Sequence, residues 1–216
     1  PKLFAGQYST EITTLLTEKV DVVHSSFWGG DIESLLLQGA PRDLFLHPRW
    51  YISTAETTMY RLDRKIPDGI IMGARGPWGV YAHKDKLNQW FRQTYTERYG
   101  TPPVYPSYQM AASMLGMKLA YDMAGKNHPK PGTEDVVKAF TGLDYEVFGT
   151  KIAMALGKGH QGEHEIAQGT YKYDKATNTP TITNIVYYPA ECVTPPEGVK
   201  AADWIKGGMK GAKNCP

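Results

Sequence analysis

The segment of the sequence that most resembles a metal site is HQGEHE at residues 160–165. Its two histidines are four residues apart, so one hypothesis is a metallohydrolase built on His160, Glu163 and His164. Zinc proteases of that kind carry HExxH on a helix with apolar periodicity, whereas glycines precede this segment at 157 and 159 and lie within it at 162. The sequence also contains no nucleophile elbow and no phosphate-binding loop. We therefore expect a protein without metal, cofactor or enzymatic activity.

A second group of residues is suited to binding rather than to catalysis. Glu56 follows the apolar segment WYISTA, and Ser26, Phe27 and Trp28 end the segment VDVVHSSFW just before Gly29. Ligand groups in open parallel sheets lie at the carboxyl ends of the strands. A glutamate there can accept hydrogen bonds from an ammonium, and aromatic rings can form an apolar wall. The alternatives are a Glu56 that only faces a helix dipole and rings that pack against the sheet edge.

These residues require an α/β framework. The expected elements of the first part are a helix with Ser9 as its N-cap, a strand at 20–26, a helix at 31–39, and strands at 50–54 and 68–75. The strands are continuously apolar, which is typical of a parallel sheet covered on both faces. The fold class predicted for this part is therefore α/β, with a Rossmann-like parallel sheet and flanking helices.

The second part is predicted to contain helices first and antiparallel strands afterwards. The expected helices are one that ends at Gly100, one after Pro106 with Tyr108, Ala111, Ala112, Leu115 and Leu119 on its inner face, and one from Thr133 with Val136, Val137 and Phe140 facing inward. After Gly149 the apolar residues alternate, which predicts a strand. Two further strands are expected at 171–173 and 182–188, joined by a turn at 174–180.

Composition and charge exclude several classes of protein. The chain has 216 residues, of which 41% are hydrophobic, and its net charge is +2. No cluster of basic residues is present, so we expect no nucleic-acid partner. No apolar run reaches the ~18–20 residues of a membrane helix. The first residues show no charged and apolar leader segment.

Both cysteines, Cys192 and Cys215, lie in the loop-like C-terminal part of the sequence. A disulfide between them would close a loop that stabilises the fold by about 3 kcal/mol in the chain-entropy model. Such a bond would also imply an oxidising compartment. The alternative is two unrelated thiols.

Several segments resemble one known family in their order along the chain. They are DVVHSSFWGG at 21–30, STAE at 53–56, PDG at 67–69, WF at 90–91, YG at 99–100, PVYPSY at 103–108 and ALGKGHQ at 155–161. Together they resemble the branched-chain amino-acid type of periplasmic solute-binding protein, which serves ABC importers and has the type I two-lobed fold. Members of this family are nearly twice as long, so the chain resembles their C-terminal portion.

The resemblance implies a division into lobes and a set of partners. Residues 1–100 and 150–216 would form the second lobe, and residues 101–149 would supply a hinge crossing and helices to the first lobe, most of which is missing. The partners would be a small-molecule ligand, the permease subunits of an ABC transporter, and the N-terminal lobe. A periplasmic location, reached through a signal peptide, is implied, or an extracellular lipid-anchored one in a Gram-positive source.

The resemblance also assigns roles to single residues. Glu56 matches the acid that binds the ligand ammonium in the family, Tyr108 matches a tyrosine that closes the cleft from the first lobe, and Tyr105 lies on the hinge. The implied function is capture of a branched-chain or aromatic amino acid between the lobes. Two alternatives stay open: a sensory receptor domain with the same fold, and binding of aromatic carboxylates or amides.

Overall fold

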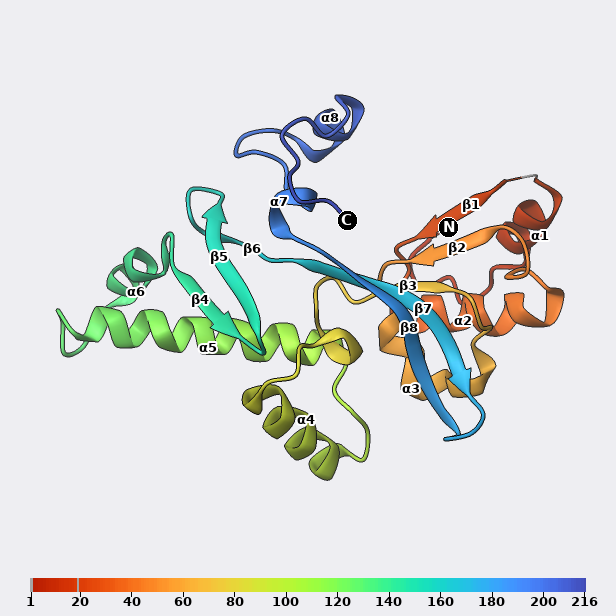
Figure 1. Cartoon of the computed structure of the whole chain (residues 1–216), viewed down its shortest axis with the longest axis horizontal. Coiled ribbons are helices and arrows are strands. Elements are labelled where there is room, and N and C mark those ends of the chain that lie inside the picture. Colours follow the sequence, from red (N-terminus) through yellow and green to blue (C-terminus); the bar gives the residue numbers. More distant parts are fainter. Residues whose placement is uncertain (1, 19) are drawn as a thin grey trace. The chain divides into compact units, whose positions relative to one another are not determined.

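The computed structural model describes residues 2–18 and 20–216, which form two compact units (Figure 1). Unit 1 comprises Pro1–Tyr81 and Ala167–Val186, and unit 2 comprises Ala82–Ile166 and Tyr187–Pro216. The chain therefore passes from one unit to the other at three points. These boundaries differ from the expected division at residues 100 and 150, and the assignment of either unit to a lobe stays a prediction.

Unit 1 is built on a five-stranded sheet with the order β1-β2-β3-β7-β8. Its strands are β1 (Val22–Ser25), β2 (Arg49–Ile52), β3 (Ile71–Gly73), β7 (Ile166–Asp174) and β8 (Thr179–Tyr188). Strands β1, β2 and β3 are parallel, as predicted, whereas β7 pairs with β3 in the antiparallel direction. The sheet is therefore mixed.

The helices of unit 1 precede its parallel strands or connect them. They are α1 (Ser9–Thr17), α2 (Gly30–Gly39) and α3 (Met59–Leu62), with short 3-10 turns η1 (Ala40–Arg42), η2 (Ala55–Thr58), η3 (Asp63–Lys65) and η4 (Gly79–Tyr81). The expectation that Ser9 caps the first helix is wrong, because the N-cap is Tyr8, whose side chain makes no cap. Tyr8 is held elsewhere: its ring is fully buried and its amide donates to Gln38 Oε1.

Unit 2 combines long helices with a small antiparallel sheet. Its elements are α4 (Lys86–Tyr99), α5 (Tyr105–Gly125), α6 (Thr133–Phe140), β4 (Asp144–Val147), β5 (Thr150–Leu156), β6 (Gln161–Glu163), α7 (Ala190–Val193) and α8 (Ala201–Lys206). Helix α4 begins where Asp85 accepts a hydrogen bond from the Asn88 amide, and it ends at Gly100 in the left-handed conformation. The predicted alternation along β5 is confirmed, since Ile152 and Met154 are buried.

The inner face of α5 agrees with the predicted one at Tyr108 and Ala112 but not at the two leucines. Leu115 and Leu119 are exposed, and the buried stripe consists of small residues with two tyrosines, namely Tyr105, Tyr108, Ala112, Gly116, Ala120 and Ala124. The reason is the close approach of β4, because a Cβ atom on Gly116 would lie 2.6 Å from the Tyr145 ring. On α6, Val137 is exposed as well, so its predicted inward position is wrong.

The C-terminal segment is held by a disulfide between Cys192 and Cys215. Cys192 lies on α7 and is buried, and Trp204 of α8 is buried too. The Trp204 indole donates a hydrogen bond to the Lys210 carbonyl, which fixes the turn after α8. Within the described part of the chain, none of the helices combines the length and the hydropathy that crossing a bilayer requires.

Candidate functional site

One candidate site lies at the carboxyl edge of the parallel strands of unit 1. Ser25 of β1 is in register with Ile52 of β2, so the residues that follow both strands emerge at the same edge. The Ser53 amide donates to the Ser25 carbonyl over 3.1 Å, and the Thr54 hydroxyl donates to the Phe27 carbonyl. The structure therefore brings the predicted residues Ser26–Trp28 and Glu56 to one region.

The two aromatic residues at this edge have different environments. Phe27 is half-buried, and its ring centroid lies 5.3 Å from that of the buried Tyr8. Trp28 is 51% exposed and lies two residues before the start of α2, and Ser26 is also exposed. Phe27 therefore packs on the interior of unit 1, whereas about half of the Trp28 side chain is exposed.

Glu56 is a fully buried carboxylate on η2. Its Oε1 atom accepts a hydrogen bond from the Val80 amide over 3.2 Å, which ties η2 to the turn η4. Gly79 makes this approach possible, because a Cβ atom there would lie 1.8 Å from Oε1. The residue has φ +62°, a conformation that glycine adopts readily.

Further carboxylates lie in the first turn of α2. Asp31 is buried and accepts hydrogen bonds from the Tyr8 hydroxyl over 2.6 Å and from the Phe4 amide over 3.1 Å. Burial of Tyr8, together with this bond, raises the Tyr8 pKa to about 12. Glu33 pairs with Arg61 at 3.3 Å. Acids in the first turn already complement the helix dipole, so this edge of the sheet suits a positively charged group better than an anion.

Tyr105 and Tyr108 belong to unit 2, where both are buried. The Tyr108 ring packs edge-on against Phe91 and Phe148, with centroids 5.0 Å from each. Its hydroxyl donates to Asn88 Oδ1 over 2.6 Å. Tyr108 is therefore packed in the core of unit 2. The role of either tyrosine in closing a ligand cleft stays a prediction.

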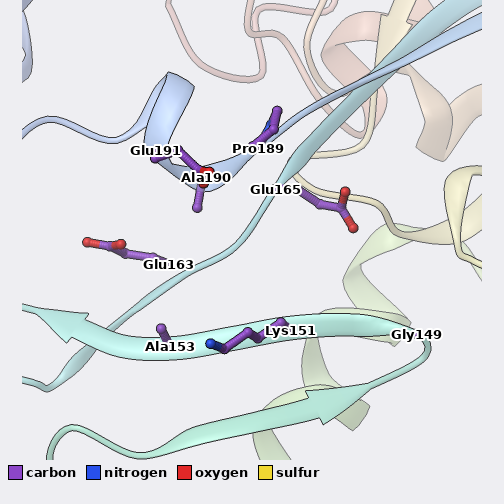
Figure 2. Close-up of a pocket in the computed structure, with 8 residues that line it drawn as sticks. All are labelled: Gly149, Lys151, Ala153, Glu163, Glu165, Pro189, Ala190 and Glu191. Atoms are coloured by element: carbon purple, nitrogen blue, oxygen red, sulfur yellow. The ribbon is translucent and has the colours of Figure 1, made fainter. Parts of the chain in front are cut away.

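Unit 2 also contains a cavity of about 500 Å³ that the sequence did not indicate (Figure 2). It is lined by Gly149, Lys151, Ala153, Glu163, Glu165, Pro189, Ala190 and Glu191. In Figure 2, Lys151 and Ala153 of β5 face the segment at the start of α7. Burial, assisted by the charge of Glu197, raises the Glu163 pKa. No sequence motif joins these residues, because they come from separate segments that only the fold brings together.

The metallohydrolase hypothesis concerned residues close to this cavity. His164 Nδ1 lies 2.7 Å from the Glu165 carbonyl oxygen, and His160 lines a different groove, beside α6. Among the residues that the structure describes, no three histidine, cysteine, aspartate or glutamate side chains are grouped as a metal ion would require. The arrangement at this end of unit 2 therefore gives the hypothesis no support.

The fold is similar to solved solute-binding proteins of ABC transporters. An amino acid ABC transporter substrate-binding protein from Pseudomonas fluorescens Pf-5 matches with a TM-score of 0.66 at 18% identity, over 86% of this chain and 49% of that chain. A solute-binding protein from R. palustris in complex with benzoate matches with a TM-score of 0.64 at 13% identity, over 86% of this chain and 48% of that chain. A leucine-, isoleucine-, valine-, threonine- and alanine-binding protein from Brucella ovis matches with a TM-score of 0.62 at 15% identity, over 86% of this chain and 47% of that chain.

These matches confirm the predicted fold class. The chain has the mixed α/β fold of type I periplasmic binding proteins, and it spans about half the length of the solved proteins it matches. The identities are low, so the likeness concerns the fold and not the ligand. No family model and no curated protein matches the sequence.

Proposed function

We propose that this chain supplies one half of a two-lobed solute-binding protein that captures a small amino acid, branched-chain or aromatic, for an ABC importer. The observation that carries the proposal is the exposed Trp28 in the segment after β1, with the buried carboxylate Glu56 in the segment after the neighbouring parallel strand β2, at the same carboxyl edge of the unit 1 sheet. The protein would act outside the cytoplasmic membrane and deliver the solute to permease subunits. It would bind and release the solute without making or breaking a covalent bond.

The chemistry of this edge favours an amino acid over an anion. An α-amino acid needs an acceptor for its ammonium and an apolar surface for its side chain. Glu56 is the proposed acceptor and Trp28 the proposed apolar surface. Burial of a leucine-sized side chain against such a surface contributes about 1.5–3 kcal/mol. An aromatic carboxylate would instead bring a negative charge close to Asp31.

Glu56 must combine this role with its bond to Val80. The carboxylate lies beneath the turn η4, so an ammonium could reach it only if residues 79–81 move aside. Binding would then be linked to a displacement of this turn, because the ligand would compete with the turn for the same carboxylate. A charge-assisted hydrogen bond to the ammonium would contribute about 1.5–3 kcal/mol.

Ligand binding by the full natural protein that carries this chain tests the proposal. Isothermal titration with leucine, phenylalanine and benzoate should show binding of an amino acid. Glu56→Gln keeps an oxygen for the Val80 amide but removes the charge, so it should weaken amino-acid binding by roughly 10- to 100-fold. Glu33→Gln is the matched control, since it removes a nearby charge that already pairs with Arg61, and it should change the affinity by only about twofold.

Two results would contradict the proposal. Unchanged amino-acid affinity in Glu56→Gln would remove Glu56 from the site. Binding of benzoate in preference to both amino acids would instead indicate a binder of aromatic carboxylates, in which Glu56 only holds the turn η4.

A further inference from the structure

The carboxyl edge of the unit 1 sheet carries a cation as well as carboxylates. Arg75 follows β3, and Met72 of that strand is in register with Ile52 of β2. Because β1, β2 and β3 are parallel, the segments that follow them emerge at one edge in the order of the strands. Arg75 therefore lies at the same edge as Glu56, one strand farther from Trp28.

The ends of β2 and β3 lie close together. A Cβ atom on Gly73 would lie 3.0 Å from the Ser53 carbonyl oxygen, so the two segments are still in contact where both strands end. The turn η2, which carries Glu56, contacts both β3 and α2. Neighbouring strands are about 4.8 Å apart. Glu56 and Arg75 therefore follow strands whose ends a single small molecule can reach.

Arg75 differs from its neighbours in exposure and in backbone conformation. The residues at 72–74 and 76–79 are all buried, and Arg75 alone is exposed within this fully described stretch. Its φ is +50°, in a region that residues with a side chain adopt at a conformational cost. Strained residues gather at binding sites, where the surrounding structure holds them in place. The segment after β3 is thus buried except for one cation.

The charges at this edge are ordered along the sheet. Glu56 and Arg75 are the only charged residues in the described segments that directly follow the three parallel strands, at 26–29, 53–56 and 74–77. Asp31 lies on α2, which follows β1. The edge is therefore negative after β1 and β2 and positive after β3. A free amino acid also joins opposite charges over a short distance, because its ammonium and its carboxylate are attached to one carbon.

We propose that Arg75 binds the carboxylate of the ligand and makes the site specific for amino acids whose carboxylate is free. A guanidinium has five N–H donors in one plane and can give a carboxylate two parallel hydrogen bonds. Glu56 would accept the ammonium of the same molecule. The inference rests on the proposed function, which supplies the class of ligand but assigns no residue to its carboxylate.

A ligand without the carboxylate tests this proposal on the full natural protein that carries this chain. Isothermal titration compares leucine with leucinamide, which keeps the side chain and the ammonium but has no negative charge. At about pH 6 the α-amino group is protonated. The wild type should prefer leucine by roughly 10- to 100-fold. Arg75→Gln should weaken leucine binding by that factor and leave leucinamide binding unchanged, so the preference disappears.

Further variants separate this role from other effects of charge. Arg49→Gln removes an exposed arginine from the first position of β2, at the opposite edge of the same sheet, and should leave both affinities unchanged. Arg75→Lys keeps the positive charge without the two parallel donors, so it should weaken leucine binding less than Arg75→Gln does. Glu56→Gln should weaken leucine and leucinamide alike, since both carry the ammonium.

Three results with these ligands would overturn the proposal. Equal affinity of the wild type for leucine and leucinamide would mean that the site does not recognise a carboxylate. A preference for leucine that persists in Arg75→Gln would assign the carboxylate to other residues. Loss of both ligands in Arg75→Gln would mean that the substitution disturbs the whole site.

Benzoate distinguishes failure of this proposal from failure of the proposed function. If the wild type binds benzoate but neither leucine nor leucinamide, the amino-acid proposal is lost. Weaker benzoate binding in Arg75→Gln would then still support Arg75 as the group that binds a carboxylate, whereas unchanged benzoate binding would remove it. A wild type that binds none of the three ligands would overturn both proposals.

Discussion

His83 Nε2 and Glu165 Oε1 lie 2.6 Å apart, and this pair links two of the three points at which the chain passes between units. Tyr187, at the third point, stacks on the His83 ring with centroids 4.8 Å apart. Each of the three residues lies within two positions of a unit boundary. The cluster therefore holds all three crossing segments together on the unit 2 side.

We predict that Glu165→Gln loosens these segments without unfolding the protein. Both side chains are partly exposed, 35% for His83 and 24% for Glu165, so the pair should contribute less than about 1 kcal/mol to global stability. Hydrogen exchange should become faster at the amides of residues 82–84 and 164–166. Asp122→Asn, which breaks an exposed pair on α5, should leave these amides unchanged. Equal exchange in Glu165→Gln and wild type would show that the pair does not hold the segments.

Gly79→Ala is predicted to destabilise unit 1. Its Cβ would collide with the Glu56 carboxylate, and alanine would be strained at φ +62°. The free energy of unfolding should fall by about 2–4 kcal/mol, since the strain and the lost Val80 bond act together. Urea denaturation measures this change.

Gly69→Ala is the control for the strain alone, because Gly69 has φ +94° but open space around its Cβ position. It should cost only about 1–2 kcal/mol. If both variants lose the same stability, the contact with Glu56 contributes nothing.

Tyr8→Phe is predicted to cost about 1–3 kcal/mol at pH 7, because the buried Asp31 carboxylate loses a donor. The effect should depend on pH in one direction. The Tyr8 pKa is raised to about 12 in the folded state and is about 10 when unfolded. The stabilisation is therefore complete below pH 10 and is lost as the pH rises from about 10 to 12. Unfolding free energies of both proteins over this range should converge, and a constant difference would contradict the assignment.

The disulfide should stabilise the C-terminal segment. The double variant Cys192→Ser/Cys215→Ser opens a loop with a sequence separation of 23 residues, which is expected to cost about 3 kcal/mol in the chain-entropy model. Denaturation with and without dithiothreitol gives the measurement. The reductant should lower the stability of the wild type and leave the double variant unchanged. If the bond in the wild type is reduced and the stability does not fall, this account is contradicted.

The sequence predicted the elements better than it predicted which sides they bury. Local signals decide where a helix stops, and Gly100 ended α4 as expected. The inner face of α5 could not be predicted in the same way, because this helix carries apolar residues on all of its sides and their periodicity is weak. Its buried side depends on the Tyr145 ring, which a distant strand places against Gly116.

The candidate site was predictable to a similar extent. The register of β1 with β2 brings Trp28 and Glu56 to one edge, as the ends of neighbouring parallel strands must. The burial of Glu56 beneath Gly79 was not predictable, because the turn that covers it follows a later strand. The hydrogen bond that Asn88 accepts from the Tyr108 hydroxyl was not predictable for the same reason, because the two residues lie on different helices.

The order β1-β2-β3-β7-β8 means that residues 82–165 are inserted between two neighbouring strands of one sheet, β3 and β7. During synthesis, β3 can pair with β7 only after the inserted residues have emerged from the ribosome. The entropy of closing so long a loop rises only as the logarithm of its length. Early folding of the inserted segment would shorten the span still to be closed, and this couples the assembly of the first unit to that of the second.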